Sequence, residues 1–332
     1  MRIKRWNPTD GAGPRRRRRR GRIAAFALLA FLLAPGTAAC SSATPTPPAV
    51  APSAPSSAGS SAVVSTDDAR TATNKALVYG FYDQLFLKSN LDVIDQYLGP
   101  VYRQHNPTVA DGPAPLRGLV AGLKTNFPGR TTTFAHVIAQ GDLVMLHTHT
   151  RGTPGDLGRA LTDVFRVTDG KISEHWDTIQ AVPASTASGS DMFSTFSGPQ
   201  VGDGQAAALT ASTETLVRQY FTQLNTNRDL TAIDRYVSSS LYEHDPAVAT
   251  GTAALRTAYA RRFAESPQST ASAPLFITEG DLSAVRYHYQ SDASDLGQAV
   301  TEILRVRDGK IVERWTVSQP VPAHSANQNT MF

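Results

Sequence analysis

The sequence DVFRVTDGKISEHW (163–176) returns later in the chain as EILRVRDGKIVERW (302–315). Upstream of it, YRQHNPTVADG (102–112) returns as LYEHDPAVATG (241–251), and in both cases the second string lies 139 residues after the first. A constant offset means that the two copies align without insertions. The repeat therefore predicts two tandem domains of one fold, each as long as a small autonomous domain.

Apolar spacing in the first copy changes from a helical to a strand-like period. Apolar residues four apart predict an amphipathic helix over 73–88, Asn90 is a suitable N-cap for a second helix that carries Leu98, and a third helix fits residues 114–125. Alternation with a period of two then predicts strands, which cover 131–139, 143–151, 159–167 and 171–179.

The pair Asp169-Gly170 between the last two strands has the composition of a tight hairpin turn. Helices followed by antiparallel strands predict the α+β class, with helices packed on one face of a curved sheet. This order and the repeated strings resemble the SnoaL-like branch of the NTF2-like superfamily. The resemblance covers both copies, including a closing motif that occurs as SDMF (190–193) and NTMF (329–332).

The resemblance implies that each copy is a cone, in which a bent sheet wraps a helix around an apolar pocket. Members of this family include polyketide cyclases, isomerases and dehydratases, as well as binding or dimerisation modules without chemistry. It also implies that the acidic residue two positions before the strand's aromatic points into the pocket. Asp163, two before Phe165, holds that position in the first copy, and Glu302 holds it in the second.

A carboxylate among apolar walls can take a proton from carbon next to a carbonyl, because burial raises its pKa. Nearby histidines could stabilise the resulting oxyanion or carry the proton. The candidate catalytic residues are Asp163, His105, His147 and His149. The candidate ligand-binding residues are Tyr82, Phe165, His175 and Trp176, with Glu302, His244 and His288 in the second copy.

Differences between the copies indicate which of these candidates could instead have a structural role. His105 and His149 recur as His244 and His288, so they could equally hold the fold. His147 and His175 become arginine in the second copy, which favours a role confined to the first, although exposed strand positions also vary in this way. Asp163 could instead be a buried acid paired with an arginine, and the recurring Trp176 could be a core residue.

His147 and His149 also suggest a metal site, since histidines two apart on a strand share a face. His175 or Asp163 could complete such a site. The family resemblance implies no metal and no cofactor, however, and no further ligand motif with metal-binding spacing occurs. We therefore expect cofactor-free chemistry without a bound metal.

The N-terminal region has the pattern of an export signal. An arginine run (15–20) precedes an apolar stretch (23–34), and the stretch is followed by Cys40, the single cysteine of the chain. A lone cysteine at this place resembles the lipobox of bacterial lipoproteins, although Thr37 stands where that motif usually has Leu. Cleavage after Ala39 by an ordinary signal peptidase is the alternative.

Removing this leader reverses the charge of the chain. Residues 1–39 hold ten of the 32 Lys and Arg but one of the 28 Asp and Glu, which leaves 22 basic and 27 acidic side chains, a net charge of −5. An acidic chain lacks the electrostatic basis for nucleic-acid binding. With one cysteine, no intrachain disulfide can form, so each domain depends on its own core.

These observations predict a signal peptide (1–39), a lipidated Cys40 with a flexible tether to residue 70, a first domain (71–184), a linker (185–209) and a second, degenerate domain (210–332). The expected function is an extracytoplasmic, membrane-anchored protein, or a secreted one if Cys40 is not lipidated. Its first domain would act on a small carbonyl-bearing molecule by aldol condensation, cyclisation or isomerisation. The alternative is a binding or dimerisation module without turnover, and the domains would pair through their sheets, within one chain or between chains.

Overall fold

The computed structural model describes residues 66–198 and 203–332, with side chains from residues 69 and 208 onward in the two segments. The predicted signal peptide, Cys40 and most of the predicted tether lie outside the described residues. Within the described segments, no helix is long and apolar enough to cross a membrane.

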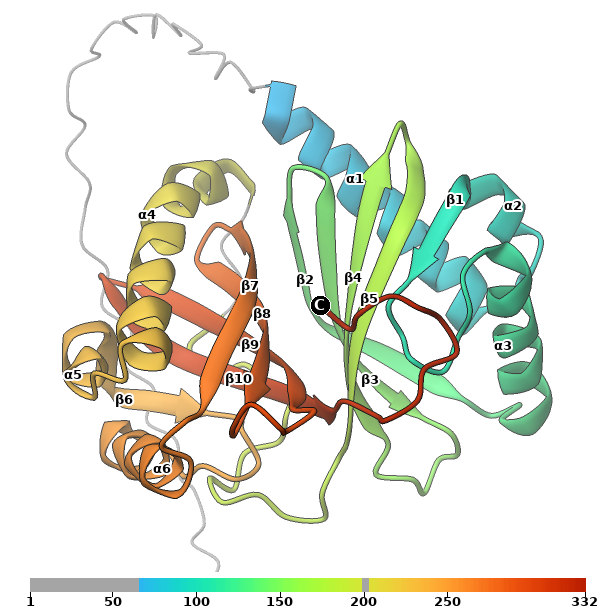
Figure 1. Ribbon diagram of the computed structural model, residues 1–332. Helices are drawn as coiled ribbons and strands as arrows, with labels where there is room; N and C mark the ends of the chain where they lie inside the picture. Colours follow the sequence, from blue (N-terminus) through green and yellow to red (C-terminus); the bar gives the residue numbers. More distant parts are fainter. Residues whose placement is uncertain (1–65, 199–202) are drawn as a thin grey trace, which may run out of the picture. The chain divides into compact units, whose positions relative to one another are not determined.

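The first copy consists of helices followed by strands (Figure 1). In chain order its elements are α1 (Thr66–Tyr82), the π-helical turn η1 (Asp83–Leu87), α2 (Val93–Tyr97), β1 (Leu98–Gln104), α3 (Pro113–Asn126), β2 (Thr131–Gln140), β3 (Leu143–Arg151), β4 (Arg159–Thr168) and β5 (Lys171–Ala181).

The second copy repeats this order element by element. Its elements are α4 (Asp203–Phe221), the π-helical turn η2 (Thr222–Thr226), α5 (Thr231–Tyr236), β6 (Val237–Glu243), α6 (Thr252–Glu265), β7 (Thr270–Glu279), β8 (Leu282–Gln290), β9 (Gln298–Arg307) and β10 (Lys310–Pro320). The predicted α+β class and the tandem arrangement of two such domains are confirmed.

Each copy builds one five-stranded sheet, in the order β1-β5-β4-β3-β2 and β6-β10-β9-β8-β7. The predicted turn between β4 and β5 is present, and both Asp169 (φ 51°) and Gly170 (φ 70°) have the positive φ that a tight hairpin requires. The prediction of a helix through Leu98 is wrong. Helix α2 ends at Tyr97 and Leu98 starts β1, which runs parallel to β5, because Pro100 disfavours a helical Gly99.

The face of each sheet that the helices cover holds the larger apolar core. In the first copy, Phe81 and Leu85 before and within η1 and Leu116 of α3 pack against Leu146 and Phe165 of the sheet. Helices α1 and α4 lie along the sheets of their own copies (Figure 1). Burial of this helix-covered face accounts for the apolar period of four in the helices.

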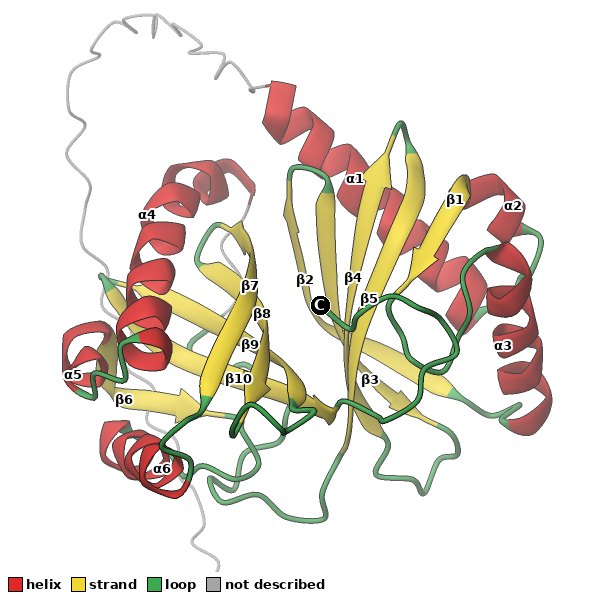
Figure 2. Ribbon diagram, in the orientation of Figure 1, coloured by secondary structure: helices red, strands yellow, loops and turns green. Residues whose placement is uncertain are grey.

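The opposite faces of the two sheets pack against each other (Figure 2). Five residues of the first sheet and five of the second form this cluster, and each pair is 139 positions apart: Ile138 and Ile277, Leu143 and Leu282, Met145 and Ala284, Val164 and Ile303, Trp176 and Trp315. Near the centre, Thr162 Oγ1 donates to Thr301 Oγ1 at 2.9 Å, and these two positions are also equivalent. The copies are therefore related by an approximate two-fold arrangement.

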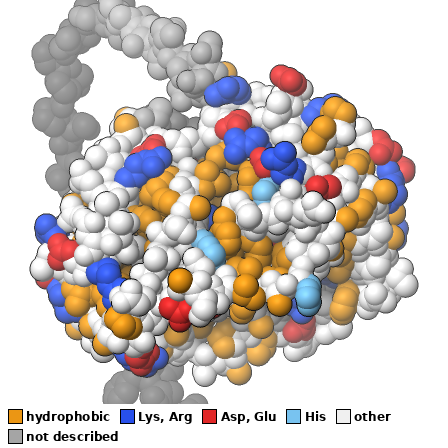
Figure 3. Space-filling model, viewed as in Figure 1, with side chains coloured by type: hydrophobic (Ala, Val, Ile, Leu, Met, Phe, Trp, Pro, Cys, Tyr) orange, Lys and Arg blue, Asp and Glu red, His pale blue; other side chains and the backbone are white. Residues whose placement is uncertain are grey.

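Charged side chains of both signs lie close together on the face seen in Figure 3, where hydrophobic side chains gather towards the middle. Ion pairs at the surface of the protein include Arg256 with Asp234 and Arg117 with Asp95 at 2.9 Å. Exposed pairs of this kind contribute about 0–1 kcal/mol each to stability. The two apolar faces of each sheet, rather than surface charge, hold the fold together.

Candidate functional site

The first copy encloses a cavity of about 360 Å³ between α1, α3, β1 and the helix-covered face of its sheet. Its wall is largely apolar and includes Phe86, Leu116, Leu119, Leu123, Phe127 and Leu161. The exposed Asp156 and Arg159 lie on its solvent side. A volume near 360 Å³ falls within the range of about 300–1,000 Å³ that is typical of small-molecule sites.

Strand alternation brings the polar side chains of the cavity together. Asp163 and Phe165 of β4 face it, and His175 and Asp177 of β5 face it beside them. Asp163 pairs with Asp177 across the two strands, and Phe165 pairs with His175. The register depends on a β-bulge after Arg166, without which Asp163 would lie opposite Trp176.

His175 and Asp163 share a contact that holds a single proton. His175 Nδ1 lies 2.8 Å from Gln104 Oε1. That oxygen also accepts the Asn106 amide at 3.0 Å, so it is an acceptor and His175 Nδ1 carries a hydrogen. The other ring nitrogen, Nε2, lies 3.1 Å from Asp163 Oδ1. One proton therefore serves this contact, either on the imidazole beside a carboxylate or on the carboxyl beside a neutral imidazole.

Asp177 is the second acid of the cavity and is incompletely paired. Its Oδ2 accepts a hydrogen bond from Asn106 Nδ2, whereas its Oδ1 is buried and has no hydrogen-bond partner among the described residues. Burial raises the pKa of Asp177, and the charge of the nearby Asp163 raises it further. The charges of His175 and Arg286 lower this pKa, but the net shift is upward. Asp177 therefore keeps its proton to higher pH than an ordinary aspartate does.

Two tyrosines complete the polar group. Tyr82 donates its hydroxyl hydrogen to Asp163 Oδ2 at 3.4 Å, and Tyr102 lies beside Gln104. Burial, and after it the charge of Asp163, raises the pKa of Tyr82, while burial and the charge of Asp177 raise the pKa of Tyr102. Both hydroxyls consequently stay neutral and can donate hydrogen bonds.

Among the described residues, Asp163, His175 and Asp177 form a group that could hold a metal ion, because one ligand atom from each lies within 4.8 Å of the others. His175 presents Nε2 and is held by Gln104, an arrangement also found around metal-binding histidines. The alternative metal site considered from the sequence, around His147 and His149, is wrong, since neither residue lies on the cavity side of β3.

His147 is buried between the two sheets and does not reach the cavity. It pairs with Thr162, next to Asp163 on β4, and so faces the opposite way. Its Nδ1 lies 3.1 Å from Nδ1 of His136, and burial lowers the pKa of His147 to about 3. The prediction that His147 shares a cavity with Asp163 is therefore corrected.

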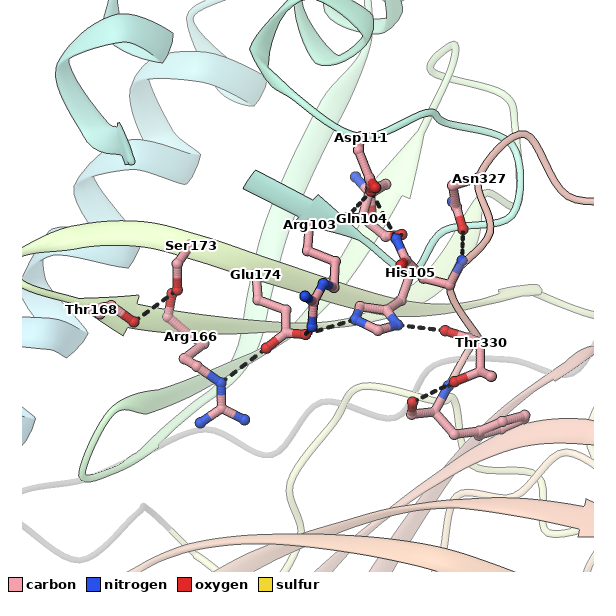
Figure 4. A network of polar contacts seen from close by, with 12 residues as sticks. Arg103, Gln104, His105, Asp111, Arg166, Thr168, Ser173, Glu174, Asn327 and Thr330 are labelled. Carbon is pink, nitrogen blue, oxygen red and sulfur yellow. Dashed lines mark hydrogen bonds and ion pairs between the residues drawn. The ribbon is translucent and has the colours of Figure 1, made fainter. Parts of the chain in front are cut away.

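His149 and His105 also lie outside the cavity. His149 donates from Nε2 to the Leu157 carbonyl at 2.8 Å and stacks on Phe193. His105 lies on the side of β5 that faces away from the cavity. There its Nε2 contacts Glu174 at 2.9 Å and its Nδ1 donates to the Thr330 carbonyl (Figure 4). Neither histidine lies where it could touch a ligand in this cavity, which corrects the predicted catalytic placement of both.

The equivalent histidines of the second copy have the same partners. His244 contacts Glu313 at 2.9 Å and the Asp191 carbonyl at 2.5 Å, and His288 donates to the Leu296 carbonyl at 2.9 Å. Trp176, predicted as a pocket wall, belongs to the cluster between the sheets and stacks on His105. The histidines that both copies keep thus have structural roles. Of the predicted site residues of the first copy, Tyr82, Phe165, His175 and Asp163 line the cavity.

Family models match both copies. The model for the SnoaL-like polyketide cyclase matches residues 76–187, and the model for the SnoaL-like domain matches residues 217–314, which together cover more than half of the chain. The chain belongs to the SnoaL-like family. No curated protein matches it.

Solved structures align with one SnoaL-like domain at a time. A SnoaL-like polyketide cyclase from Agrobacterium tumefaciens is 14% identical, with 32% of this chain and 91% of that chain covered and a TM-score of 0.29. TsrD from Streptomyces laurentii is 22% identical over 33% and 89% of the two chains, with a TM-score of 0.28. A protein of unknown function with a cystatin-like fold from Xanthomonas campestris is 23% identical over 32% and 89%, with a TM-score of 0.29.

The second SnoaL-like domain fills the corresponding space with its own side chains. Glu302, which replaces Asp163, accepts hydrogen bonds from Tyr259 at 3.1 Å and Tyr287 at 3.0 Å. Arg314 replaces His175 and bonds Glu302 and Glu243, each at 3.1 Å. Tyr259 and Tyr287 stand where the first domain has the smaller Val120 and Thr148. The acid of the second domain is therefore neutralised inside a packed core.

Burial and charge agree with this reading of the second domain. Glu302 and Arg314 are 1% and 4% exposed. Burial favours the neutral form of Glu302, but the charge and hydrogen bond of Arg314, the charge of Arg262 and the hydrogen bond from Tyr287 together outweigh it and lower the pKa of Glu302. A carboxylate fixed by a guanidinium is a poor proton acceptor. This packing does not support the prediction that Glu302 binds a ligand.

Sequence analysis did not propose four residues that shape the first site: Tyr102, Gln104, Asn106 and Asp177. All four differ in the second copy, where the equivalent positions are Leu241, Glu243, Asp245 and Thr316. The comparison of the two copies thus contained the signal. A full list of differences around the repeated strings would have found these residues without a structure.

The pKa of Asp177 predicts how one substitution changes stability with pH. Since folding raises this pKa, protonated Asp177 stabilises the fold below about pH 4, the ordinary range of aspartate, and that contribution is lost as pH rises through the folded pKa. Asp177→Asn removes the titration. We expect the melting temperature of Asp177→Asn relative to the unsubstituted protein to increase between about pH 4 and pH 8, as measured by calorimetry.

Asp191→Asn provides a control of opposite sign. Burial opposes the ionised form of Asp191, but hydrogen bonds from Ser194 and Phe193 outweigh it and lower the pKa. Ionised Asp191 stabilises the fold above the ordinary range, and this contribution is lost as pH falls, so its variant should weaken relative to the unsubstituted protein as pH rises. Parallel pH profiles for the two variants would contradict the assignment of Asp177.

Proposed function

We propose that the first SnoaL-like domain binds a small, mainly apolar molecule with a carbonyl group and moves a proton on it without a cofactor. The contact between His175 and Asp163, with its single proton inside an apolar cavity, carries this proposal. A carboxyl group in contact with an imidazole is suited to general acid–base catalysis. The family includes polyketide cyclases, so aldol-type cyclisation and isomerisation are the reaction classes that fit.

In the proposed reaction Asp163 accepts a proton from carbon next to the carbonyl. The electron pair of the broken C–H bond moves into the carbonyl and forms an enolate. The enolate then either takes the proton back at another carbon of a conjugated chain, or its own carbon bonds to a second carbonyl of the same molecule, whose oxygen receives the proton. No oxidant, reductant or second reactant is needed.

Hydrogen-bond donors beside Asp163 suit the charge that develops on the enolate oxygen. Asp177 keeps its proton to raised pH, and its Oδ1 has no partner among the described residues, so it can donate to a ligand oxygen. The Tyr82 hydroxyl, which donates to Asp163 at 3.4 Å, can turn its single hydrogen to the ligand oxygen once Asp163 has accepted a proton. Donors in place before the reaction stabilise such an oxyanion more effectively than water does.

Substituting Asp163 with Asn separates catalysis from binding. The amide keeps the size of the side chain but accepts no proton, so turnover should fall by about 10²–10⁴-fold while ligand affinity changes little. Exchange of carbon-bound hydrogen for deuterium in D2O, followed by NMR on a set of aryl 1,3-diketones, measures the proton transfer directly and needs no knowledge of the final product.

Glu302→Gln is the matched control, since it makes the same kind of change at the equivalent position of the second domain. It should leave exchange unaltered. Exchange that persists in Asp163→Asn would contradict the assigned role of Asp163. Binding of the diketones by the unsubstituted protein without any exchange would refute catalysis and favour a binding module.

We also propose that the chain is exported and anchored by a lipid on Cys40. The arginine run, the apolar stretch and the single cysteine after Ala39 support this proposal. A tether rich in Ala, Pro, Ser and Thr would then separate the two domains from the membrane surface. A substrate in this setting would come from outside the cytoplasm.

Cys40→Ala tests the anchor. The unsubstituted protein should incorporate a labelled fatty acid and sediment with membranes, whereas Cys40→Ala should do neither, because a single thiol carries the lipid. Ser41→Ala serves as the neighbouring control and should behave like the unsubstituted protein. Release of both forms into the medium without label would instead indicate ordinary signal-peptidase cleavage.

A further inference from the structure

Each SnoaL-like domain is followed by a segment that crosses to the other domain. We name these segments the first strap (residues 186–193) and the second strap (residues 325–332). The first strap bonds the second domain, where Ala187 donates its amide hydrogen to Pro246 at 2.9 Å. The second strap bonds the first domain, where Ala326 donates to Pro107 at 2.7 Å. The exchange is reciprocal, and its bonds occupy equivalent positions.

The histidines that both copies keep hold these straps. His244 of the second domain bonds the Asp191 carbonyl of the first strap, and His105 of the first domain bonds the Thr330 carbonyl of the second strap (Figure 4). The closing phenylalanines return to their own domains, with Phe193 stacked on His149 and Phe332 stacked on His288.

The straps differ at two positions that matter for the site. The second strap has Asn327 and Asn329, where the first has Ser188 and Ser190. Hydrogen bonds of the two serines stay within the first strap: the Ser190 amide donates to Ser188 Oγ at 3.2 Å, and the Ser190 carbonyl accepts from Thr186 at 2.7 Å. The two asparagines reach across to the first domain.

Asn327 Nδ2 donates to the carbonyls of Asn106 at 2.7 Å and Val109 at 2.8 Å. Asn329 Nδ2 donates to the Gln104 carbonyl at 2.9 Å and to Asp111 Oδ1 at 2.8 Å. Asp111 Oδ1 also accepts the Gln104 amide at 2.8 Å. The second strap thus fixes the backbone of the segment that runs from Gln104 to Val109.

Gln104 and Asn106 are the residues whose side chains orient the acids and the histidine of the cavity. Gln104 Oε1 accepts from His175 Nδ1 at 2.8 Å, and Asn106 Nδ2 donates to Asp177. The second strap therefore fixes the backbone of the same two residues whose side chains bond His175 and Asp177 in the cavity. Figure 4 shows Gln104, Asp111 and Asn327 of this network around the end of β1.

A second contact from the second domain reaches the same site. Arg286 of β8 donates to the backbone carbonyl of Asp177 at 2.9 Å, whereas His147, its equivalent in the first domain, contacts His136. The guanidinium of Arg286 is buried, and its charge favours the ionised form of Asp177. The second domain thus contributes to the first site at two places, although its own cavity is filled.

We propose that Asn327 and Asn329 are positioning residues for the site of the first domain. They fix Gln104 and Asn106, and through them they fix the tautomer of His175 and the direction of the Asp177 carboxyl. The catalytic consequence rests on the proposed function, whereas the effect on His175 does not. The filled second domain then acts as the support that carries this strap.

The test replaces both asparagines with the residues of the first strap, as Asn327→Ser and Asn329→Ser together. Serine is compatible with the backbone of an equivalent strap, so the fold should persist, and a melting curve checks it. Ser188→Ala with Ser190→Ala is the matched control in the first strap. All are made in the full chain.

The primary readout is the long-range ¹H–¹⁵N NMR spectrum of the histidine rings, in which the His175 signal is assigned by its loss in His175→Gln. The unsubstituted protein and the control should show His175 protonated at Nδ1 and slow to exchange that hydrogen. The double serine variant should lose this protected signal. Where deuterium exchange on a diketone is measurable, its rate constant should fall at least about tenfold with little change in affinity, because misplacement affects the reacting geometry more than binding.

An unchanged His175 signal in a folded double variant would overturn the proposal, whether or not the protein turns over a substrate. If the double variant does not fold, the single Asn329→Ser variant is measured instead, because it releases Gln104 and leaves Asn327 in place. Loss of the protected His175 signal in this variant would support the proposal, and retention of the signal would overturn it. A protein with the expected His175 response but no exchange on any diketone would support the strap and contradict the proposed function alone.

Discussion

The structure depends on the burial of both faces of each sheet. Helices cover one face, and the other would be left with large apolar side chains such as Trp176, Val164 and Met145. The second copy supplies the matching face, with Trp315 and Ile303 at equivalent positions. At about 25 cal/mol for each Å² of apolar surface removed from water, such contacts favour the paired arrangement strongly. One sheet therefore stabilises the other, and neither copy can be lost without exposing its partner.

This mutual dependence leaves the helix-covered faces of the two copies free to differ. The faces between the sheets keep their apolar character, whereas the helix-covered faces differ. In the first domain small residues such as Thr148 leave a cavity around Asp163 and His175. In the second, Tyr287 and Arg314 fill the space and pair with Glu302. The second domain still packs against the first although its pocket is filled. It also carries the second strap to the first domain and supplies Arg286, which donates to the Asp177 carbonyl.

Sequence analysis predicted two tandem α+β domains, the strands β2 to β5 and the residues that share a face, because these follow from repeats and from periods of two and four. It missed β1 and assigned Leu98 to a helix instead. It could not determine which face bounds the cavity. Every residue of β3 from Leu143 to His149 is buried, so alternation separates His147 from Thr148 without saying which one is inside. The β-bulge after Arg166 was also invisible, and it is this bulge that places Asp177 rather than Trp176 opposite Asp163.

The reciprocal straps lay beyond sequence reasoning for a different reason. The sequence shows the closing motifs, and the recurrence of His105 as His244 is compatible with either a structural or a catalytic role. Only the spatial arrangement shows that each histidine holds the strap of the other copy. Contacts between residues more than 200 positions apart have no signal in the period of a single sequence.

The central claim, one open pocket and one filled pocket in each chain, is tested most directly by counting ligands. Native mass spectrometry of the purified protein with increasing amounts of an aryl 1,3-diketone should saturate at one molecule for each chain. Leu119→Trp, which places a large ring in the first cavity, should abolish binding, and Ala258→Trp at the equivalent position should not. Two bound molecules for each chain, or loss of binding in Ala258→Trp alone, would contradict the account.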